Sequence, residues 1–536
     1  MCGAACVNFM PTTTHRQYIP ARRQTIPSMT ANTPPRSPDA APDAPVVARR
    51  GWILAALMLT MALAAMDITI VATAVPQIVG DLGGFEHFSW LFSIYLLGQT
   101  VTIPIYGKLA DLYGRKPVLI GGTSVFLLGS AACAIAWEMV PLIVFRGIQG
   151  LGAGSIMACV NTLAGDLYSV RERGRVQGWL SSVWGVAAIL GPTLGGAFAE
   201  YATWRWVFLI NLPIGLAAVV LIIRFLHEQP PKQRHAIDYA GAVLMMLAGS
   251  ASVFGLLQGG SAWPWTSGPS VLTFGVAAAF IVATIVRERL AAEPIMPGWV
   301  WSHRVMLGSN LAMLGMGMVM MAPGAYLPVF AQSVLGLGPI AAGLVLASMS
   351  VGWVTSSSYS DRLYLRIGFR DTALIGAGLM LAAIAGFTLL PERPSYWLVV
   401  LDQIILGAGF GLISTPLLVG LQSIVPWARR GVATSTNMWS RYLGQSLGAA
   451  MAGALFNTVM VARLEGAPPV VRDAVPDVST VVGTLQSDTL DAQGIDYLRS
   501  AFDAATQNVY LGMIVAAVLA FLLVLIVPRR PTSMLE

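Results

Sequence analysis

The sequence predicts an all-α membrane protein with fourteen transmembrane helices, arranged as two pseudo-symmetric six-helix halves plus two inserted helices. The chain of 536 residues is 56% hydrophobic and only 11% charged, whereas a soluble domain carries about 25% charged residues. Apolar runs long enough to cross a bilayer, which takes about 20 residues, recur along the chain. Basic residues gather in alternate connections between these runs.

The N-terminal segment 1–50 differs from the rest of the chain. It is rich in Pro, Thr, Ser, Ala and Arg and poor in apolar residues, which predicts a disordered cytoplasmic tail. It contains no signal-peptide apolar region, so we expect the first span to act as the insertion signal. The four cysteines show neither a disulfide framework nor metal-ligand spacing: they are Cys2, Cys6, Cys133 and Cys159.

Fourteen apolar runs give the predicted spans. Runs seven and eight are the insertion between the two halves. The runs lie near 52–79, 89–109, 117–137, 140–165, 176–199, 206–226, 238–258, 269–287, 306–332, 340–360, 371–390, 395–420, 432–457 and 507–527.

The distribution of Lys and Arg predicts the orientation. With the N-terminus inside, every inner segment carries a basic cluster, and no outer loop except 458–506 carries more than one basic residue. Because Arg529 and Arg530 follow the last span, the number of spans is even and both termini are predicted to be cytoplasmic. We therefore expect a multi-pass protein of the cytoplasmic (inner) membrane. The net charge of +6 is explained by this orientation, so the lipid bilayer and not nucleic acid is the expected partner.

One outer loop, 458–506, is long and carries seven acidic residues. We favour a solvated loop over a small folded cap or a docking site for a partner. A periplasmic adaptor protein is left open as a partner.

An internal repeat relates the two halves. The segment Gly150-Leu-Gly-Ala-Gly of the fourth span matches Gly407-Ala-Gly-Phe-Gly of the twelfth, and Pro76 matches Pro328. Repeated halves with a substrate site between them are the usual plan of secondary transporters. The predicted domains are the tail 1–50, an N-terminal half 51–230, two inserted helices 231–290, and a C-terminal half 300–530.

Four charged residues lie deep inside predicted spans, away from the span ends, where charge is costly and usually functional. Asp67 is the favoured proton carrier, because a carboxylate in a low-dielectric site beside Arg146 can load and release a proton. A static Asp67–Arg146 pair that only fixes helix packing is the alternative. Asp402 is interpreted as a second proton or cation site, a partner for Arg441, or a residue in contact with water. Arg441 either neutralises Asp402 or holds an anionic group of the substrate.

Five aromatic residues are candidates for lining an apolar substrate cavity: Trp90, Trp184, Tyr326, Phe330 and Trp439. A position at the membrane interface is the alternative for each of them. No nucleotide-binding loop, HExxH or GxSxG motif is present in the sequence. We therefore expect a protein that is not an enzyme, binds no metal and needs no cofactor, the proton gradient being the driving force.

Five sequence motifs lie between residues 66 and 215. They are Gly107-Lys-Leu-Ala-Asp-Leu-Tyr-Gly-Arg-Lys-Pro117, Met66-Asp-Ile-Thr-Ile-Val-Ala-Thr-Ala-Val-Pro76, Arg146-Gly-Ile-Gln-Gly-Leu-Gly-Ala-Gly154, Gly185 with Gly191-Pro-Thr-Leu-Gly-Gly196, and Trp204-Arg-Trp-Val-Phe-Leu-Ile-Asn-Leu-Pro-Ile-Gly215. The first resembles the inner-loop signature of the major facilitator superfamily. The second and fifth resemble motifs of its fourteen-span drug:proton antiporter branch, the third resembles its fourth-span motif, and the fourth resembles its fifth-span antiporter motif. The resemblance covers about residues 50–530.

The resemblance implies roles for individual residues. In the inner-loop motif, Asp111 and Arg115 take part in closing the cytoplasmic side, and Arg146 is linked to proton coupling. Asp361 precedes Arg362 where many relatives have Gly, so the second half need not repeat this closure. The residues implied in gating or conformational change are Gly107, Asp111, Gly114, Arg115, Gly185, Gly191, Pro192 and Gly195.

Together these features predict a proton-coupled exporter of amphiphilic small molecules or drugs that works by alternating access. Two buried acids would suit lipophilic cations, and two buried arginines would suit fatty acids or other anions; both substrate classes stay open. The alternatives are a dedicated exporter of one lipid, siderophore or metabolite, and a non-transporting membrane sensor.

Overall fold

The structure is a computed structural model, and every regular element among its described residues is a helix. This confirms the predicted all-α class. The predicted tail lies largely outside the described residues, and Ala48–Glu536 form one compact unit. The described residues are 44–83, 90–228, 238–259, 263–391, 395–475, 481, 484 and 491–529.

The helices follow the predicted apolar runs closely. The first part of the chain forms α1 (Ala44–Leu82), α2 (Trp90–Tyr113), α3 (Arg115–Ala134), α4 (Met139–Leu167), α5 (Val170–Tyr201), α6 (Trp206–Leu209), α7 (Asn211–Phe225), α8 (Tyr239–Gln258) and α9 (Gly268–Leu290). The second part forms α10 (Trp299–Ser302), α11 (Arg304–Ser333), α12 (Pro339–Ile367), α13 (Phe369–Thr388), α14 (Tyr396–Ile424), the 3-10 helix η2 (Trp427–Arg429), α15 (Arg430–Glu465), α16 (Pro469–Ala474) and α18 (Ala492–Val524).

Among the described residues, twelve helices are long and apolar enough to cross a membrane. The two other predicted spans correspond to α2 and α12, which have 24 and 29 residues. Both carry buried polar residues, such as Gln99 and Ser357, that lower their apolar content. The count of fourteen spans therefore stays a prediction, while the multi-pass helical fold does not depend on it.

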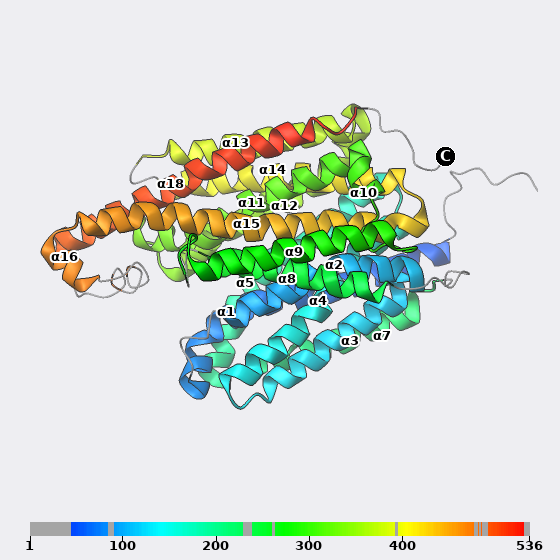
Figure 1. Ribbon diagram of the computed structural model, residues 1–536, viewed down its shortest axis with the longest axis horizontal. Coiled ribbons are helices and arrows are strands. Elements are labelled where there is room, and N and C mark those ends of the chain that lie inside the picture. The colour runs from blue at the N-terminus through cyan, green and yellow to red at the C-terminus, as the bar shows by residue number, and fades with distance from the viewer. Residues whose placement is uncertain are drawn as a thin grey trace, which may run out of the picture. The chain divides into compact units, whose positions relative to one another are not determined.

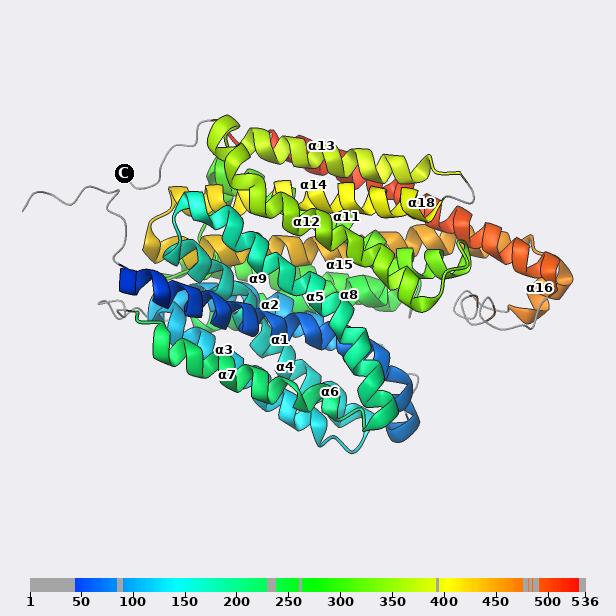
Figure 2. The ribbon, with the colours of Figure 1, turned by 180° about the vertical axis from the view of Figure 1, so that it is seen from behind.

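The helices form two groups that meet along a seam. In the first group α4 packs against α2 and α3, and in the second α14 packs against α12 and α13 while α15 packs against α11 and α18. Figures 1 and 2 show α3, α4 and α7 on the side of the molecule opposite α13, α14 and α18. At the seam α2 packs on α15 and α5 packs on α12, and α8 and α9 pack chiefly on each other. The domain boundaries at 51–230, 231–290 and 300–530 remain a prediction.

Glycines let these helices approach closely, as expected for membrane bundles. A Cβ atom at Gly150 of α4 would lie 2.9 Å from the Cα of Tyr95 in α2. A Cβ at Gly448 of α15 would lie 2.7 Å from the Cα of Met318 in α11. Larger side chains at either position would force the backbones apart.

The described part of segment 458–506 is not the solvated loop that we favoured. α15 continues to Glu465, α16 follows, and α18 begins at Ala492. At about 1.5 Å per residue the 36 residues of α15 span about 54 Å, well beyond a bilayer core of about 30 Å. Figures 1 and 2 show the ends of α15 and α18, with α16, projecting past the other helices. The prediction was wrong for this part because the described helices enclose an apolar core, whose buried residues include Met460, Leu464, Val471, Leu498 and Phe502.

Candidate functional site

A buried ion pair joins α1 to α4. The guanidinium of Arg146 donates from Nη1 to Oδ2 of Asp67, and both side chains have no exposed surface. The same Nη1 donates to Oε1 of Gln149 at 2.8 Å, and Nε of Arg146 donates to the carbonyl oxygen of Leu91 at 3.1 Å. The sequence predicted that Asp67 and Arg146 would meet, and the structure brings them together.

The second carboxylate oxygen of Asp67 is held by two amides. Oδ1 accepts hydrogen bonds from Nε2 of Gln149 at 2.8 Å and from Nδ2 of Asn211 at 3.3 Å. Asn211 also donates to Oγ of Ser130 on α3 at 3.0 Å. A buried ion pair is tolerated only when further hydrogen bonds satisfy its remaining polar atoms. The amides do this for the carboxylate of Asp67, whereas Nη2 of Arg146 has no hydrogen-bond partner among the described residues. The sequence analysis missed Gln149 and Asn211, whose only signal is a polar residue inside an apolar run.

Arg146 also contacts α2, the helix that packs against the second group. Its Cζ lies 4.3 Å from the ring centroid of Tyr95, which is fully buried. A guanidinium over an aromatic face is attracted by the ring quadrupole. The ion pair is therefore connected through Tyr95 to the seam between the two groups. Sequence reasoning missed Tyr95 as well.

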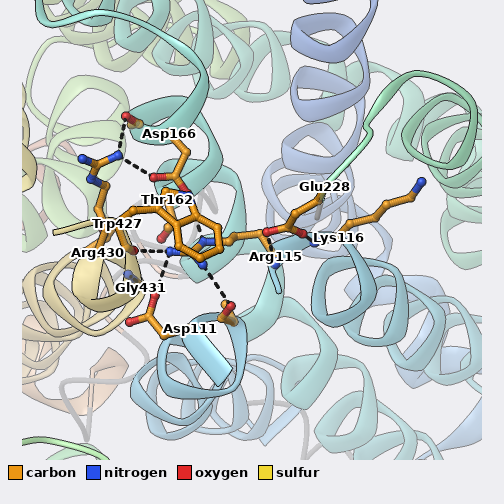
Figure 3. Close-up of polar contacts among 12 residues, drawn as sticks. Asp111, Arg115, Lys116, Thr162, Asp166, Glu228, Trp427, Arg430 and Gly431 are labelled. Atoms are coloured by element: carbon orange, nitrogen blue, oxygen red, sulfur yellow. Dashed lines mark hydrogen bonds and ion pairs between the residues drawn. The ribbon is translucent and has the colours of Figure 1, made fainter. Parts of the chain in front are cut away.

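A second polar cluster ties the two groups together where α2 ends (Figure 3). Asp111 accepts hydrogen bonds from the backbone N–H groups of Gly431 and Val432, both at 2.8 Å. These N–H groups belong to the first turn of α15, where the helix dipole favours a negative charge. Asp111 also accepts a hydrogen bond from Arg115 at 2.9 Å.

Arg115 extends this cluster across the seam. Its Cζ lies 3.6 Å from the ring centroid of Trp427, and its Nε lies 2.9 Å from Oδ2 of Asp166. Asp166 in turn pairs with Arg430 at 2.6 Å (Figure 3). The result is an alternating chain of charges from α2, α3 and α4 to α15. We call the cluster the latch; its residues are Asp111, Arg115, Asp166, Trp427, Arg430 and Gly431.

Glycine is required where α2 crosses α15 at the latch. A Cβ at Gly107 would overlap Ser435 and lie 2.8 Å from the carbonyl oxygen of Gly431. Nearby Gly114 has a φ of +96° and connects α2 to α3, where Glu228 accepts from the backbone N–H of Arg115 at 2.9 Å. The structure thus gathers the predicted gating residues of the inner loop. Their partners on α15 were missed, because a contact with backbone N–H groups has no sequence signature.

The predicted residues of α5 face both groups. A Cβ at Gly191 would lie 2.7 Å from Cβ of Thr69 in α1, and one at Gly195 would lie 2.7 Å from the carbonyl oxygen of Ile70. A Cβ at Gly185 would lie 3.0 Å from Cβ of Ser350 in α12. α5 continues as a helix through position 192, but the side chain of Pro192 lies outside the described residues.

Asp402 and Arg441 do not meet. Asp402 accepts a hydrogen bond from its neighbour Gln403 at 3.0 Å and is 9% exposed. Its Oδ1 lies 3.6 Å from the position of a Cβ at Gly386, so it faces α13. Arg441 lies on α15, with its Cζ 5.0 Å from the ring centroid of Tyr442. No ion pair joins Asp402 to Arg441 in this part of the structure.

Most of the predicted cavity aromatics pack on other rings, and their place in a substrate cavity stays a prediction. Four of the five contact an aromatic residue of another helix, and Trp184 is partly buried. These four therefore contribute to helix packing. The ring pairs are Trp90 with Phe254, Tyr326 with Phe456, Phe330 with Phe387, and Trp439 with Trp301.

Comparison with known proteins identifies the family. The sequence model of the Major Facilitator Superfamily matches residues 57–449. The chain belongs to the major facilitator superfamily. It is 35% identical over 416 residues to "Multidrug resistance protein 3" of Bacillus subtilis, covering 77% of this chain and 80% of the relative. It is 33% identical over 410 residues to "Multidrug transporter protein MdtP" of the same organism, covering 76% of each.

A fungal relative and a solved structure agree with this assignment. The chain is 33% identical over 429 residues to "MFS-type efflux pump LUC4" of Fusarium sp, covering 77% of this chain and 75% of the relative. The human organic anion transporter MFSD10 (TETRAN) shares the fold with a TM-score of 0.59, covering 89% of this chain and 99% of that chain, at 14% identity. The resemblance to the multidrug efflux branch is confirmed, and the chain is a multi-pass membrane transporter.

Proposed function

We propose that the protein exports amphiphilic small molecules or drugs across the cytoplasmic membrane in exchange for protons, by alternating access. The buried Asp67–Arg146 pair carries this proposal, because a carboxylate inside a membrane bundle is a functional site by default. Relatives named as multidrug transporters and efflux pumps support the export direction. In this proposal Asp67 drives the transport cycle by alternating between its ionised form and its neutral, protonated form.

Asp67 can act as the proton carrier through its contacts. While it is ionised, it holds Arg146 and accepts from Gln149 and Asn211. A proton that binds a carboxylate oxygen of Asp67 removes the negative charge and leaves the guanidinium of Arg146 unbalanced. Because Arg146 lies over the ring of Tyr95, its displacement would alter the contacts of α2 at the seam. Protonation therefore favours a different conformation of the bundle, as alternating access requires.

The latch serves as the gate in this proposal. Its ion pairs and hydrogen bonds join the first group to α15 at one end of the bundle. The orientation predicted from the basic residues puts this end in the cytoplasm. The present conformation would then be closed toward the cytoplasm, and opening requires the Asp111 and Asp166 contacts to break. Close approach at Gly107 allows the gate to close fully.

Inverted vesicles with an imposed pH gradient test the proposal. Proton release on addition of a test compound is recorded with a pH-sensitive dye for wild type, Asp67→Asn and Asp81→Asn. Asp81 is a matched control, since it lies on α1 but is exposed and pairs with Arg205. We expect wild type and Asp81→Asn to release protons and Asp67→Asn not to do so. Equal proton release by wild type and Asp67→Asn would make the ion pair structural and overturn the proposal.

A further inference from the structure

Arg441 is a cation inside α15 without a counter-charge. It is partly buried, and in the described part of the chain it makes neither an ion pair nor a hydrogen bond; its Nε atom is buried without an acceptor. The fully buried Arg115 and Arg146, in contrast, each pair with a carboxylate. An unbalanced guanidinium in a span is costly, and such residues face the interior or a substrate pathway.

The face of α15 that carries Arg441 points into the bundle. Thr434, Met438, Arg441 and Gln445 follow one another at helical spacing and share that face. The hydroxyl of Thr434 accepts from Nε2 of Gln422 on α14 at 3.0 Å, and Gln445 contacts the sulfur atom of a methionine on α11 at 3.2 Å. Thr434 and Met438 are buried, whereas Arg441 and Gln445 are partly exposed. The exposed fraction of the side chains on this face therefore increases with distance from the latch.

The two acidic residues that lie deep inside the predicted spans do not neutralise Arg441. Asp67 is already paired with Arg146. Asp402 faces α13, on the same side of α14 as Gly409, where a Cβ would lie 2.8 Å from the carbonyl oxygen of Gly376. The interior between α11, α14 and α15 thus has a positive charge that no described carboxylate balances.

Unpartnered polar groups lie on the adjoining seam. The hydroxyls of Tyr95 and Tyr442 and both polar atoms of the Gln99 amide are buried and have no hydrogen-bond partner among the residues that the structure describes. Tyr95 and Gln99 are four residues apart on one face of α2, and Tyr442 lies on α15, which packs against α2 at the seam. Buried polar groups without partners are rare, and each such group requires an explanation, such as a water or a ligand.

We infer that Arg441, Tyr95, Gln99 and Tyr442 form a head-group site that selects amphiphiles with an anionic head. The guanidinium supplies the charge, while the two hydroxyls and the amide nitrogen donate hydrogen bonds to the oxygen atoms of the anion. Because the ring of Tyr95 also contacts Arg146, a ligand bound at this site would change the surroundings of the Asp67–Arg146 pair. This inference deepens the proposed function and rests on it.

Matched probes of opposite charge test the site. Octanesulfonate and octyltrimethylammonium have the same chain length and keep their charge at any pH. Their affinities are measured by calorimetry on protein in nanodiscs, for wild type, Arg441→Gln and the control Arg366→Gln, an equal loss of charge at an exposed position of α12. Wild type and the control should bind the sulfonate, and Arg441→Gln should bind it about 10- to 100-fold more weakly, as for a charged hydrogen bond.

Two conservative variants separate recognition from folding. Tyr95→Phe and Tyr442→Phe remove only hydroxyls that have no partner, so the midpoint of thermal unfolding should not fall, while affinity for the sulfonate should weaken about tenfold. Unfolding at a lower temperature with unchanged affinity would assign these hydroxyls to the fold and overturn their part in the site. Unchanged affinity of a folded Arg441→Gln for the sulfonate would overturn the inference.

The two proposals can fail separately. If wild-type vesicles release protons on addition of octyltrimethylammonium but the protein does not bind octanesulfonate, the anionic site is wrong and proton-coupled export stands. If octanesulfonate binds and binding depends on Arg441, but neither probe causes proton release, the site stands as a binding site and the coupling proposal is wrong.

Discussion

Substitution of Gly107 by alanine tests the gate most sharply. A Cβ at this position overlaps the side chain of Ser435 and lies 2.8 Å from the carbonyl oxygen of Gly431. The Ser435 hydroxyl can rotate, but its Cβ and the Gly431 carbonyl are fixed to α15. Carbon and oxygen atoms approach to about 3.3 Å at closest, so α2 and α15 must separate by about 0.5 Å or more.

The effect of this separation on the stability of the closed conformation can be estimated. Inserting a methyl group into a packed site costs about 1–3 kcal/mol. If the open conformation does not share this cost, the ratio of closed to open molecules falls about 5- to 150-fold. Separation also lengthens the two hydrogen bonds from α15 to Asp111, which weakens the closed state further. Gly107→Ala should therefore populate the conformation that is open at the latch.

Distances between spin labels measure this shift. Cysteines introduced at Tyr113 and Ala428, which are exposed at the latch end, would carry the labels in a background without native cysteines. Gly121→Ala is the control, since a Cβ there meets no atom within 4 Å. We expect a longer distance in Gly107→Ala and partial reversal when Ser435→Gly is added. If Gly107→Ala and Gly121→Ala give the same distances as the unsubstituted protein, the assigned steric role of Gly107 is wrong.

Two further predictions concern stability. Gly191→Ala should lower the midpoint of thermal unfolding, because its Cβ would lie 2.7 Å from Cβ of Thr69 and overpacking costs about 1–3 kcal/mol. Gly196→Ala is the control, because a Cβ there meets no atom within 4 Å, and it should not lower the midpoint. Equal midpoints for the two variants would contradict the steric role of Gly191. Hydrogen bonds from Trp204 and from the Arg205 guanidinium lower the pKa of Asp81 below its ordinary value. A lowered acid pKa stabilises the fold above the ordinary value of about 4, and this contribution is lost as the pH falls through the folded-state pKa. The midpoint of thermal unfolding, measured from pH 7 to pH 3, should therefore fall less for Asp81→Asn than for wild type. An equal fall of the midpoint in both proteins would contradict this.

The fold could be predicted because apolar runs and basic clusters report directly on a bilayer. The Asp67–Arg146 pair could be predicted for the same reason, since two opposite charges in apolar spans are costly unless they meet. Gln149 and Asn211 could not, because neutral amides in a span indicate no particular partner. The backbone N–H groups at the start of α15 that bind Asp111 are also invisible in the sequence, since nearly every residue has one.

The segment 458–506 was predicted less well than the spans. Its seven acidic residues indicated a solvated loop, but charges on one face of a helix do not prevent packing on the other. Met460 and Leu464 lie four residues apart on α15, as do Leu498 and Phe502 on α18, and all four are buried. Helical periodicity in short runs was therefore more informative here than net charge.

A comparison of substrate exchange with substrate accumulation tests most directly whether Asp67 couples transport to protons. In proteoliposomes, exchange of labelled for unlabelled substrate needs only movement of the loaded site, whereas accumulation against a gradient needs the proton. We predict that Asp67→Asn exchanges substrate, which also shows that it is folded, but does not accumulate it when a pH gradient is imposed, while Asp81→Asn does both. Accumulation by Asp67→Asn at the wild-type level would contradict the account.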